Sequence, residues 1–262
     1  MPADTPKILA LDFDGVLCNG LLEYFQTSWR TYCQIWQPNS QIPPQDLADK
    51  FYRLRPVIET GWEMPVLVRA LVLGVAEEKI REDWSAVAQE IVTSEKLDAA
   101  ESGKKLDLVR DEWIKTDLDS WLALHSTYPG VIERLSQILT QLVTELFIVT
   151  TKEGRFVKQL LQQQGIQLPE ERIIGKECKR PKYQTLQQIL AEFQCVASQL
   201  WFVEDRLKTL QLVRQQPELQ GMRLYLADWG YNTKAQHESV AKEPSINLLT
   251  LSQFSQDFSA WS

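Results

Sequence analysis

From Tyr128 onward the sequence alternates short apolar runs with stretches of helical periodicity, and this alternation restricts the fold more than any other feature. The apolar runs occupy residues 146–149, 172–174, 200–203 and 222–226, and the helical stretches residues 130–139, 155–164, 186–193 and 207–213. Alternating strands and helices favour right-handed crossovers and a parallel sheet covered by helices on both faces. The apolar run Ile8–Leu11 adds one more strand. We therefore predict an α/β fold with a doubly wound parallel sheet.

Between the first strand and this alternating region lies a long segment, about Gly20 to Ser126, that reads as almost wholly helical. Its predicted helices cover residues 21–36, 45–58 and 77–92, and a further helix carries Leu106 through Leu122. Open parallel sheets bind ligands at the carboxyl ends of their strands, so an insertion after the first strand is placed to cover the site. We predict a Rossmann-like core of residues 1–19 and 127–262, with an inserted all-helical cap domain of residues 20–126.

Composition excludes several classes of protein. With Lys+Arg 28 against Asp+Glu 35, the net charge is −7, and without a basic run nucleic-acid binding has little electrostatic support. No apolar stretch approaches the ~20 residues of a membrane span, and the first four residues lack a basic segment and an apolar signal core. The four cysteines are scattered, so we expect buried, reduced thiols in a cytoplasmic protein.

Two aspartates, Asp12 and Asp14, stand where the first strand runs out before Gly15. Side chains alternate along a strand, so these two carboxylates are expected to point the same way, opposite to Phe13, and such close like charges require a cation between them. A hard divalent cation such as Mg²⁺ prefers such oxygen ligands. An Asp-rich turn is the structural alternative, since Asp and Gly are common in turns.

Polar residues also follow the other predicted strands. Thr150-Thr151-Lys152 follows one strand, Glu204-Asp205-Arg206 follows another, and a lysine-rich loop spans residues 176–182. In a doubly wound sheet these strand ends converge on the edge that carries Asp12 and Asp14. Carboxylates, a hydroxyl and a cation are the groups that phosphoryl transfer requires.

The ordered set Asp12-Phe13-Asp14-Gly15-Val16, Val149-Thr150, a lysine and Glu204-Asp205 resembles the motifs of the haloacid dehalogenase superfamily of phosphatases. The helical insertion after the first motif is similar to the cap of the phosphoglycolate phosphatase and β-phosphoglucomutase branch. Two further phrases are similar to that branch, Tyr128-Pro129-Gly130-Val131 and Trp229-Gly230-Tyr231-Asn232.

The resemblance implies a role for each carboxylate. Asp12 would attack phosphorus and become an aspartyl-phosphate, and Asp14 would serve as general acid and then general base. Asp205 would ligate Mg²⁺, with Glu204 beside it as ligand or supporting partner, and Asp12 and Asp14 would complete the metal site. The alternative for Glu204 and Asp205 is capping of the helix that begins near Arg206.

The resemblance also implies phosphate-binding residues. Thr150 would hydrogen-bond a phosphate oxygen together with backbone N–H groups at the start of the next helix. Thr151 would assist, although a helix cap is its structural alternative. Lys182, directly before a predicted helix, is our choice for the phosphate-binding lysine, with Lys179 and Lys176 as alternatives.

These expectations combine into one predicted activity. The chain would be a cytoplasmic, Mg²⁺-dependent phosphatase, monomeric or homodimeric, that hydrolyses a small phosphorylated metabolite through an aspartyl-phosphate. Two alternatives remain open: a phosphomutase using the same aspartates, and a non-catalytic descendant that binds a protein partner through the cap. A phosphonatase is disfavoured, because no cap lysine is clearly placed for Schiff-base chemistry.

Overall fold

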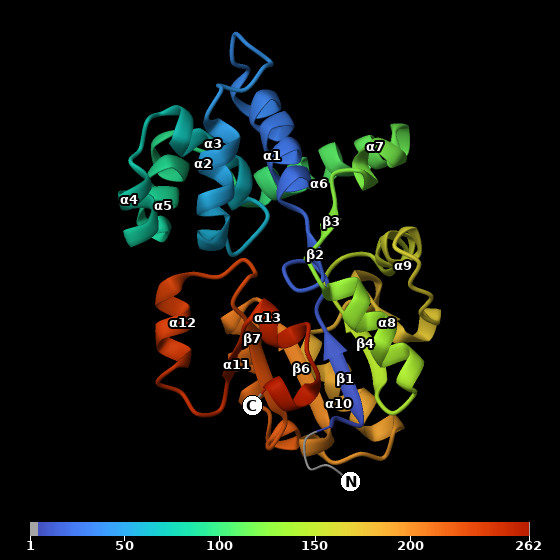
Figure 1. Ribbon diagram of the computed structural model, residues 1–262. Helices are drawn as coiled ribbons and strands as arrows, with labels where there is room; N and C mark the ends of the chain where they lie inside the picture. The colour runs from blue at the N-terminus through green and yellow to red at the C-terminus, as the bar shows by residue number, and fades with distance from the viewer. Residues whose placement is uncertain (1–4, 262) are drawn as a thin grey trace. The chain divides into compact units, whose positions relative to one another are not determined.

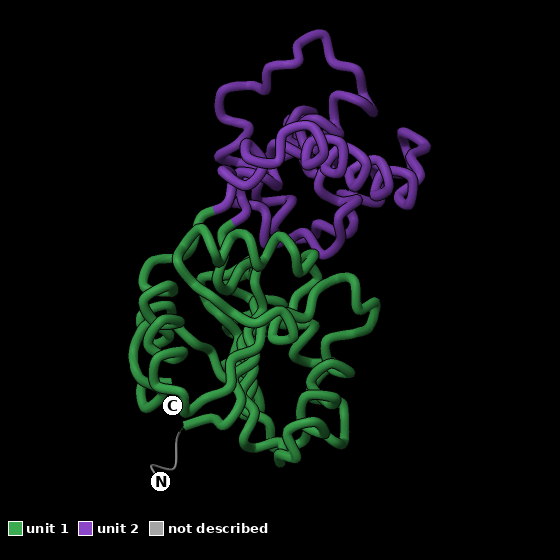
Figure 2. The backbone as a smooth tube through the Cα atoms, turned by 90° about the vertical axis from the view of Figure 1, so that its right-hand side faces the viewer, with its two compact units in different colours: residues 1–19, 126–262 green, residues 20–125 purple. Residues whose placement is uncertain are grey.

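The computed structural model describes residues 5–261 (Figure 1). The chain divides into two compact units, residues 1–19 with 126–262, here called the core, and residues 20–125, here called the insertion (Figure 2). Residues 1–4, on which the expected lack of a signal segment depends, lie outside the described residues.

The core contains a six-stranded parallel sheet in the order β5-β4-β1-β6-β7-β8. Its strands are β1 (Ile8–Leu11), β4 (Glu145–Val149), β5 (Ile173–Ile174), β6 (Leu200–Glu204), β7 (Arg223–Ala227) and β8 (Asn247–Leu249). The predicted α/β fold is confirmed, and the strands from β1 to β7 in this sheet match the predicted apolar runs. Strand β8 was not predicted, because its three residues include only two apolar ones.

Helices cover both faces of this sheet. The core α-helices are α8 (Val131–Gln141), α9 (Gly154–Gln163), α10 (Lys182–Glu192), α11 (Leu207–Arg214), α12 (Lys234–Val240) and α13 (Leu251–Phe254). On one face Ile8 and Ala10 pack in a cluster with apolar residues of α10 and α11. On the other face Trp201 and Tyr225 contact Trp261, with ring centroids 5.9 and 5.4 Å apart. Alternating side chains of the strands therefore fill two separate apolar layers.

Short elements complete the core. Strand β2 (Cys18–Asn19) pairs antiparallel with β3 (Ser126–Thr127), where the chain leaves and re-enters the core. The core also has short 3₁₀ helices: η2 (Glu170–Arg172), η3 (Lys176–Cys178), η4 (Ala197–Gln199), η5 (Pro217–Leu219) and η6 (Phe258–Trp261). The two-stranded pair was not predicted, since two residues on each side leave no periodic signal.

The insertion is built from helices, as expected, but the helix over residues 63–72 was not predicted, and two of the predicted helices are each interrupted. Its helices are α1 (Leu21–Trp36), α2 (Leu47–Leu54), η1 (Arg55–Val57), α3 (Glu63–Val72), α4 (Glu77–Glu82), α5 (Trp84–Ser94), α6 (Ala99–Thr116) and α7 (Leu118–Leu122). Asp83 separates α4 from α5, and Asp117 separates α6 from α7. Each of these aspartates accepts a backbone N–H of the following helix and thereby starts a new helix.

The cysteine prediction is only partly right. All four cysteines are free thiols, but Cys178 is exposed and Cys195 half-buried, whereas Cys18 and Cys33 are buried. Cys178 is the last residue of the short helix η3, which follows β5 and has no buried residue. Within residues 5–261, no helix combines the length and the apolar character that crossing a membrane requires.

Candidate active site

Strands β1, β4 and β6 bring distant parts of the sequence to one edge of the sheet. Strand β1 lies between the other two, and its last residue, Leu11, is in register with Ile148 of β4 and Val203 of β6. The carboxyl ends of parallel strands share an edge, so the residues that follow them converge. Asp12 continues this alignment by donating its backbone N–H to the Val203 carbonyl, 2.9 Å away.

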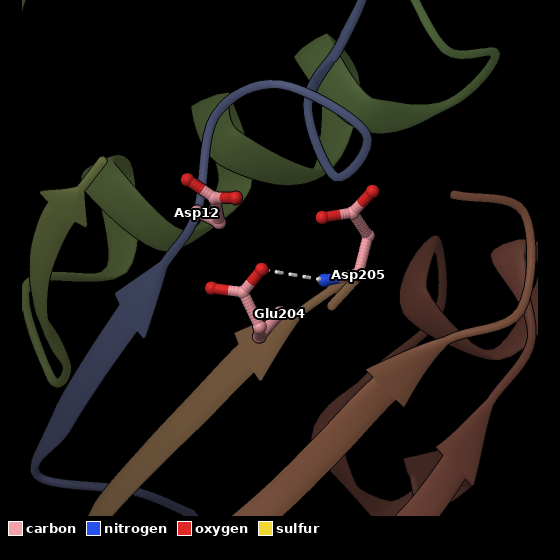
Figure 3. Close-up of side chains that lie close together, drawn as sticks. All are labelled: Asp12, Glu204 and Asp205. Atoms are coloured by element: carbon pink, nitrogen blue, oxygen red, sulfur yellow. Dashed lines mark hydrogen bonds between the residues drawn. The ribbon is translucent and has the colours of Figure 1, made fainter. Parts of the chain in front are cut away.

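Three carboxylates meet at this edge: Asp12, Glu204 and Asp205, here called the acidic cluster (Figure 3). Each offers an oxygen that lies within 4.8 Å of the others. The residues are 5, 0 and 1 % exposed, respectively. Burying several carboxylates together is costly unless a cation or hydrogen bonds compensate them.

One lysine partly compensates the acidic cluster. Lys182 Nζ lies 2.7 Å from Asp12 Oδ1 and 2.7 Å from Glu204 Oε2. The other oxygen of Glu204 accepts the backbone N–H groups of Asp205 and Arg206 at 3.2 and 3.0 Å. Glu204 thus fixes both the lysine and the turn after β6. The expected alternative of capping is met only in part, because these amides precede α11.

The pKa values of the three carboxyl groups reflect the charge that Lys182 leaves uncompensated. Burial raises the pKa of Asp12 to about 7, and the charge of Glu204 adds to the rise while Lys182 opposes it. Burial, with the charge of Asp12, raises the pKa of Asp205 to about 6, although the positive charge of Arg206 opposes the rise. Burial also raises the pKa of Glu204. One ammonium group does not neutralise three carboxylates.

This donor set fits a hard divalent cation such as Mg²⁺. Carboxylate oxygens are the ligands that such ions prefer, and a double positive charge would balance the excess that Lys182 leaves. The residues that could hold the ion are Asp12, Asp205 and Glu204. Lys182 contacts one oxygen of Asp12 and one oxygen of Glu204. Asp205 is the member of the acidic cluster that this lysine does not contact within 4.0 Å.

Two glycines and the loop after β7 form a tight enclosure around Asp205. A Cβ atom at Gly15 would lie 2.1 Å from Asp205 Oδ2, and one at Gly230 would lie 2.3 Å from Asp205 Cβ. Asp205 Oδ2 accepts the Tyr231 backbone N–H at 2.8 Å, and Asn232 Nδ2 donates to the Asp205 carbonyl at 2.9 Å. Residues 230–232 therefore orient Asp205. The resemblance of residues 229–232 to the family's turn did not predict this role.

Asp14 does not join the acidic cluster. Its two carboxylate oxygens lie 3.2 and 3.4 Å from Lys152 Nζ. The expected alternation of side chains does not extend this far, because β1 ends at Leu11 and Gly15 adopts a left-handed turn with φ +87°. Asp12 and Asp14 consequently have different partners. The pairing with Lys152 was missed, although Lys152 stands two residues after Thr150 at a strand end.

The expected phosphate-binding residues differ in their surroundings. Thr150 directly follows β4 and is buried. Its Oγ1 accepts the Lys152 backbone N–H at 3.1 Å, and its hydroxyl hydrogen can still be donated to another group. Thr151 is exposed and does not cap α9, whose N-cap is Glu153. The Gly154 amide at the start of α9 donates to the carboxylate of Glu177 at 3.1 Å. We expected this amide to donate to phosphate, but it donates to a side-chain carboxylate instead.

The three candidate lysines are clearly separated by the structure. Lys176 and Lys179 are exposed in the loop before α10, whereas Lys182, the first residue of α10, reaches the acidic cluster. His237, in α12, pairs through its Nε2 with Asn232 Oδ1. His125 contacts the Trp121 carbonyl at 3.1 Å within the insertion.

Comparison with protein families identifies the class of this chain. The family described as haloacid dehalogenase-like hydrolase matches residues 76–214, which is more than half of the chain. The chain therefore belongs to the haloacid dehalogenase-like hydrolases. The matched stretch includes Thr150, Lys182, Glu204 and Asp205. It begins at residue 76 and therefore does not include Asp12. No curated protein matches the chain.

Solved structures agree with this family. A predicted phosphatase from Clostridium acetobutylicum is 12% identical, with 96% of this chain and 97% of that chain covered and a TM-score of 0.60. A predicted phosphoglycolate phosphatase from Haemophilus somnus is 17% identical, with 87 and 88% covered and a TM-score of 0.57. A haloacid dehalogenase-like family protein from Streptococcus pneumoniae is 13% identical, with 93% of each chain covered and a TM-score of 0.56. At these identities the likeness shows a shared fold.

Proposed function

We propose that this hydrolase is a Mg²⁺-dependent phosphatase that hydrolyses a small phosphorylated metabolite through an aspartyl-phosphate on Asp12. The observation that carries the proposal is the acidic cluster, in which a lysine contacts only two of three buried carboxylates. Burying carboxylates together costs stability, and a role in phosphoryl transfer explains why they are placed together. The phosphatase names of several structural relatives support the same reaction class.

In the first step, an oxygen of Asp12 bonds to phosphorus while the bond from phosphorus to the ester oxygen breaks. The leaving oxygen takes a proton from the carboxylic acid of Asp14. Asp12 is suited to the attack because it lies at the end of β1 beside Lys182, which holds one of its oxygens at 2.7 Å. Covalent catalysis divides one difficult displacement into two easier ones.

In the second step, a water oxygen bonds to phosphorus and the bond to Asp12 breaks. Asp14, now a carboxylate, takes a proton from the water, so both aspartates return to their starting states. Asp14 is not part of the acidic cluster, and this separation supports a role in proton transfer rather than in metal binding.

The phosphate group would be bound by Thr150 and Lys182. The hydroxyl of Thr150 keeps its hydrogen for a phosphate oxygen, and Lys182 adds positive charge within reach of Asp12. Thr151 is exposed at the same strand end and would contribute through its backbone or hydroxyl. Donors fixed in advance stabilise charge that develops on the transferred group.

Asp12, Asp205 and Glu204 would hold the cation. When bound, Mg²⁺ would supply positive charge that offsets the phosphate oxygens and keeps the attacking carboxylate close to phosphorus. We assign the insertion the part of a cap that governs substrate choice, and the core the chemistry. The free thiols of the chain support a cytoplasmic setting.

Phosphate release from a panel of small phosphate esters, with Mg²⁺ and with chelator, tests the proposal. We expect Mg²⁺-dependent release, and we expect Asp12→Asn to reduce turnover at least ~10⁴-fold while the protein stays folded. Near-normal activity of Asp12→Asn would remove Asp12 as the nucleophile. An isomerised phosphate ester in place of free phosphate would identify a phosphomutase. No turnover across the panel would favour a non-catalytic binding protein.

A further inference from the structure

We propose that Lys152 is a positioning residue that holds the Asp14 carboxylate away from the acidic cluster and keeps it available for proton transfer. The proposal rests on the proposed phosphatase function, because Asp14 has a proton to transfer only if an ester bond is broken. It concerns a contact between two loops of the core, one after β1 and one after β4.

The backbone around Asp14 is fixed by a tight turn. The Phe13 carbonyl accepts the N–H groups of Leu17 and Cys18 at 2.9 Å each, and the Gly15 N–H donates to the Cys18 carbonyl at 2.8 Å. With the main chain held in this way, Asp14 can change its surroundings mainly by rotating its side chain. The partner of its carboxylate therefore decides where that carboxylate points.

Lys152 is itself firmly held. Its backbone N–H donates to Thr150 Oγ1 at 3.1 Å, and its carbonyl accepts the Lys176 N–H at 2.9 Å. Its side chain is only 9% exposed, and that of Asp14 19%. A lysine buried to this degree requires hydrogen-bond acceptors, and the two carboxyl oxygens of Asp14 lie within its reach. Lys152 thus connects Asp14 to Thr150 and to the loop before α10.

The alternative partner for Asp14 is the cation expected at the acidic cluster. Asp14 lies two residues from Asp12, and its charge is close enough to act on that carboxylate. A carboxylate released from Lys152 beside a bound divalent cation would turn toward the cation. Once bound there, it would no longer deliver a proton to the leaving oxygen. Lys152 prevents this loss by holding both oxygens of Asp14.

Substrates with different leaving groups separate this role from a general structural one. A p-nitrophenolate group leaves without a proton, whereas an alkoxide requires one, so only the alkyl ester depends on a correctly placed acid. We compare p-nitrophenyl phosphate with glycerol phosphate and use kcat/KM, which reports the transfer to Asp12. The variants are Lys152→Met, the conservative Lys152→Arg, and the control Lys158→Met, which removes a lysine of α9 paired with Glu170.

For Lys152→Met we expect kcat/KM to fall ~100-fold or more with glycerol phosphate but less than ~5-fold with p-nitrophenyl phosphate. Lys152→Arg should recover most of the loss, and Lys158→Met should behave as the unmodified protein. Equal losses on both substrates, or no loss on either, would overturn the proposal. If the unmodified protein hydrolyses neither ester nor any member of the panel, the proposed function itself fails.

Calorimetric titration with Mg²⁺ supplies a measurement that needs no turnover. Because Lys152→Met releases a fourth carboxylate toward the cluster, its Mg²⁺ affinity should equal or exceed that of the unmodified protein. The double variant Lys152→Met with Asp14→Asn should lose any gain. A Mg²⁺ affinity weakened tenfold by Lys152→Met alone would show that the lysine supports the metal site instead, and would refute the proposal.

Discussion

The insertion and the core each bury a carboxylate group, but they compensate it differently. In the insertion, Glu23 is 1% exposed and accepts bonds from Arg110 Nε at 2.7 Å, Thr27 Oγ1 at 2.7 Å and Trp121 Nε1 at 3.2 Å. A single acid there faces a guanidinium group and two neutral donors. In the core, the acidic cluster contains three carboxylates, and Lys182 contacts two of them, those of Asp12 and Glu204.

The difference teaches which buried acids to associate with chemistry. Glu23 has the partners that a structural ion pair needs, so its burial serves the packing of the helices. The acidic cluster has too few positive partners, and its carboxylates accordingly have raised pKa values. Excess charge of one sign in a buried site indicates that something else is meant to bind there.

The largest contrast should appear when one acid is removed from each region. Glu23→Gln leaves Arg110 without its main partner, and we expect a loss of roughly 3–5 kcal/mol in the free energy of unfolding. Asp12→Asn relieves repulsion and leaves Lys182 paired with Glu204, so without added cation it should be neutral or stabilising. Chemical denaturation of both variants measures this. A large loss in Asp12→Asn would contradict the account.

Addition of a cation should stabilise only the overcharged region. At a Mg²⁺ concentration 100 times its dissociation constant, linkage predicts about 2.7 kcal/mol of added stability. Glu23→Gln should retain this gain, and Asp205→Asn should lose most of it. Thermal unfolding with Mg²⁺, and again after chelation, provides the measurement. An equal gain in Asp205→Asn would mean that the ion binds elsewhere.

Acidity should affect the cation-free protein in a defined direction. The folded pKa of Asp12, about 7, and that of Asp205, about 6, lie above the ordinary value of 3.8, so the folded state holds extra protons between these limits. The stabilisation that these two groups contribute should be complete below about pH 3.8 and should be lost as the pH rises through 6 and 7, by about 1.4 kcal/mol per pH unit for each extra proton. Asp12→Asn should flatten this slope. A slope of opposite sign would contradict the charge imbalance.

A smaller effect should follow from disturbing the enclosure around Asp205. Asn232→Ala removes donors to the carbonyls of Asp205 and Ala227, so we expect Mg²⁺ affinity to weaken about tenfold. Asn247→Ala is the matched control, because Asn247, in β8, donates to the carbonyl of Leu224, in β7, rather than to a residue of the site. Equal affinities in both variants would show that Asn232 does not orient the ligand.

Much of the core was predictable because its strands are continuous apolar runs whose ends carry polar residues. Once those ends share an edge, Asp12 and Asp205 must approach each other. Most helices of the insertion were also predicted, but α3 and the breaks at Asp83 and Asp117 were not. A capping aspartate interrupts the backbone without interrupting the apolar period on either side.

The finer arrangement of the site was beyond the sequence for a physical reason. The alternation rule holds only within a strand, and β1 ends at Leu11, so the direction of Asp14 depends on a turn and on Lys152 from another loop. The occupation of the Gly154 amide by Glu177 likewise depends on tertiary contact. The catalytic roles of Asp12, Asp14 and Thr150 stay predictions.

Calorimetric titration of the cation-free protein with Mg²⁺ tests the central claim most directly. The account predicts one bound ion per chain, with binding lost in Asp205→Asn, strongly reduced in Asp12→Asn and unchanged in Glu23→Gln. A protein that binds no Mg²⁺, or that binds it equally well in all of these variants, would contradict the claim that the acidic cluster is a metal-dependent active site.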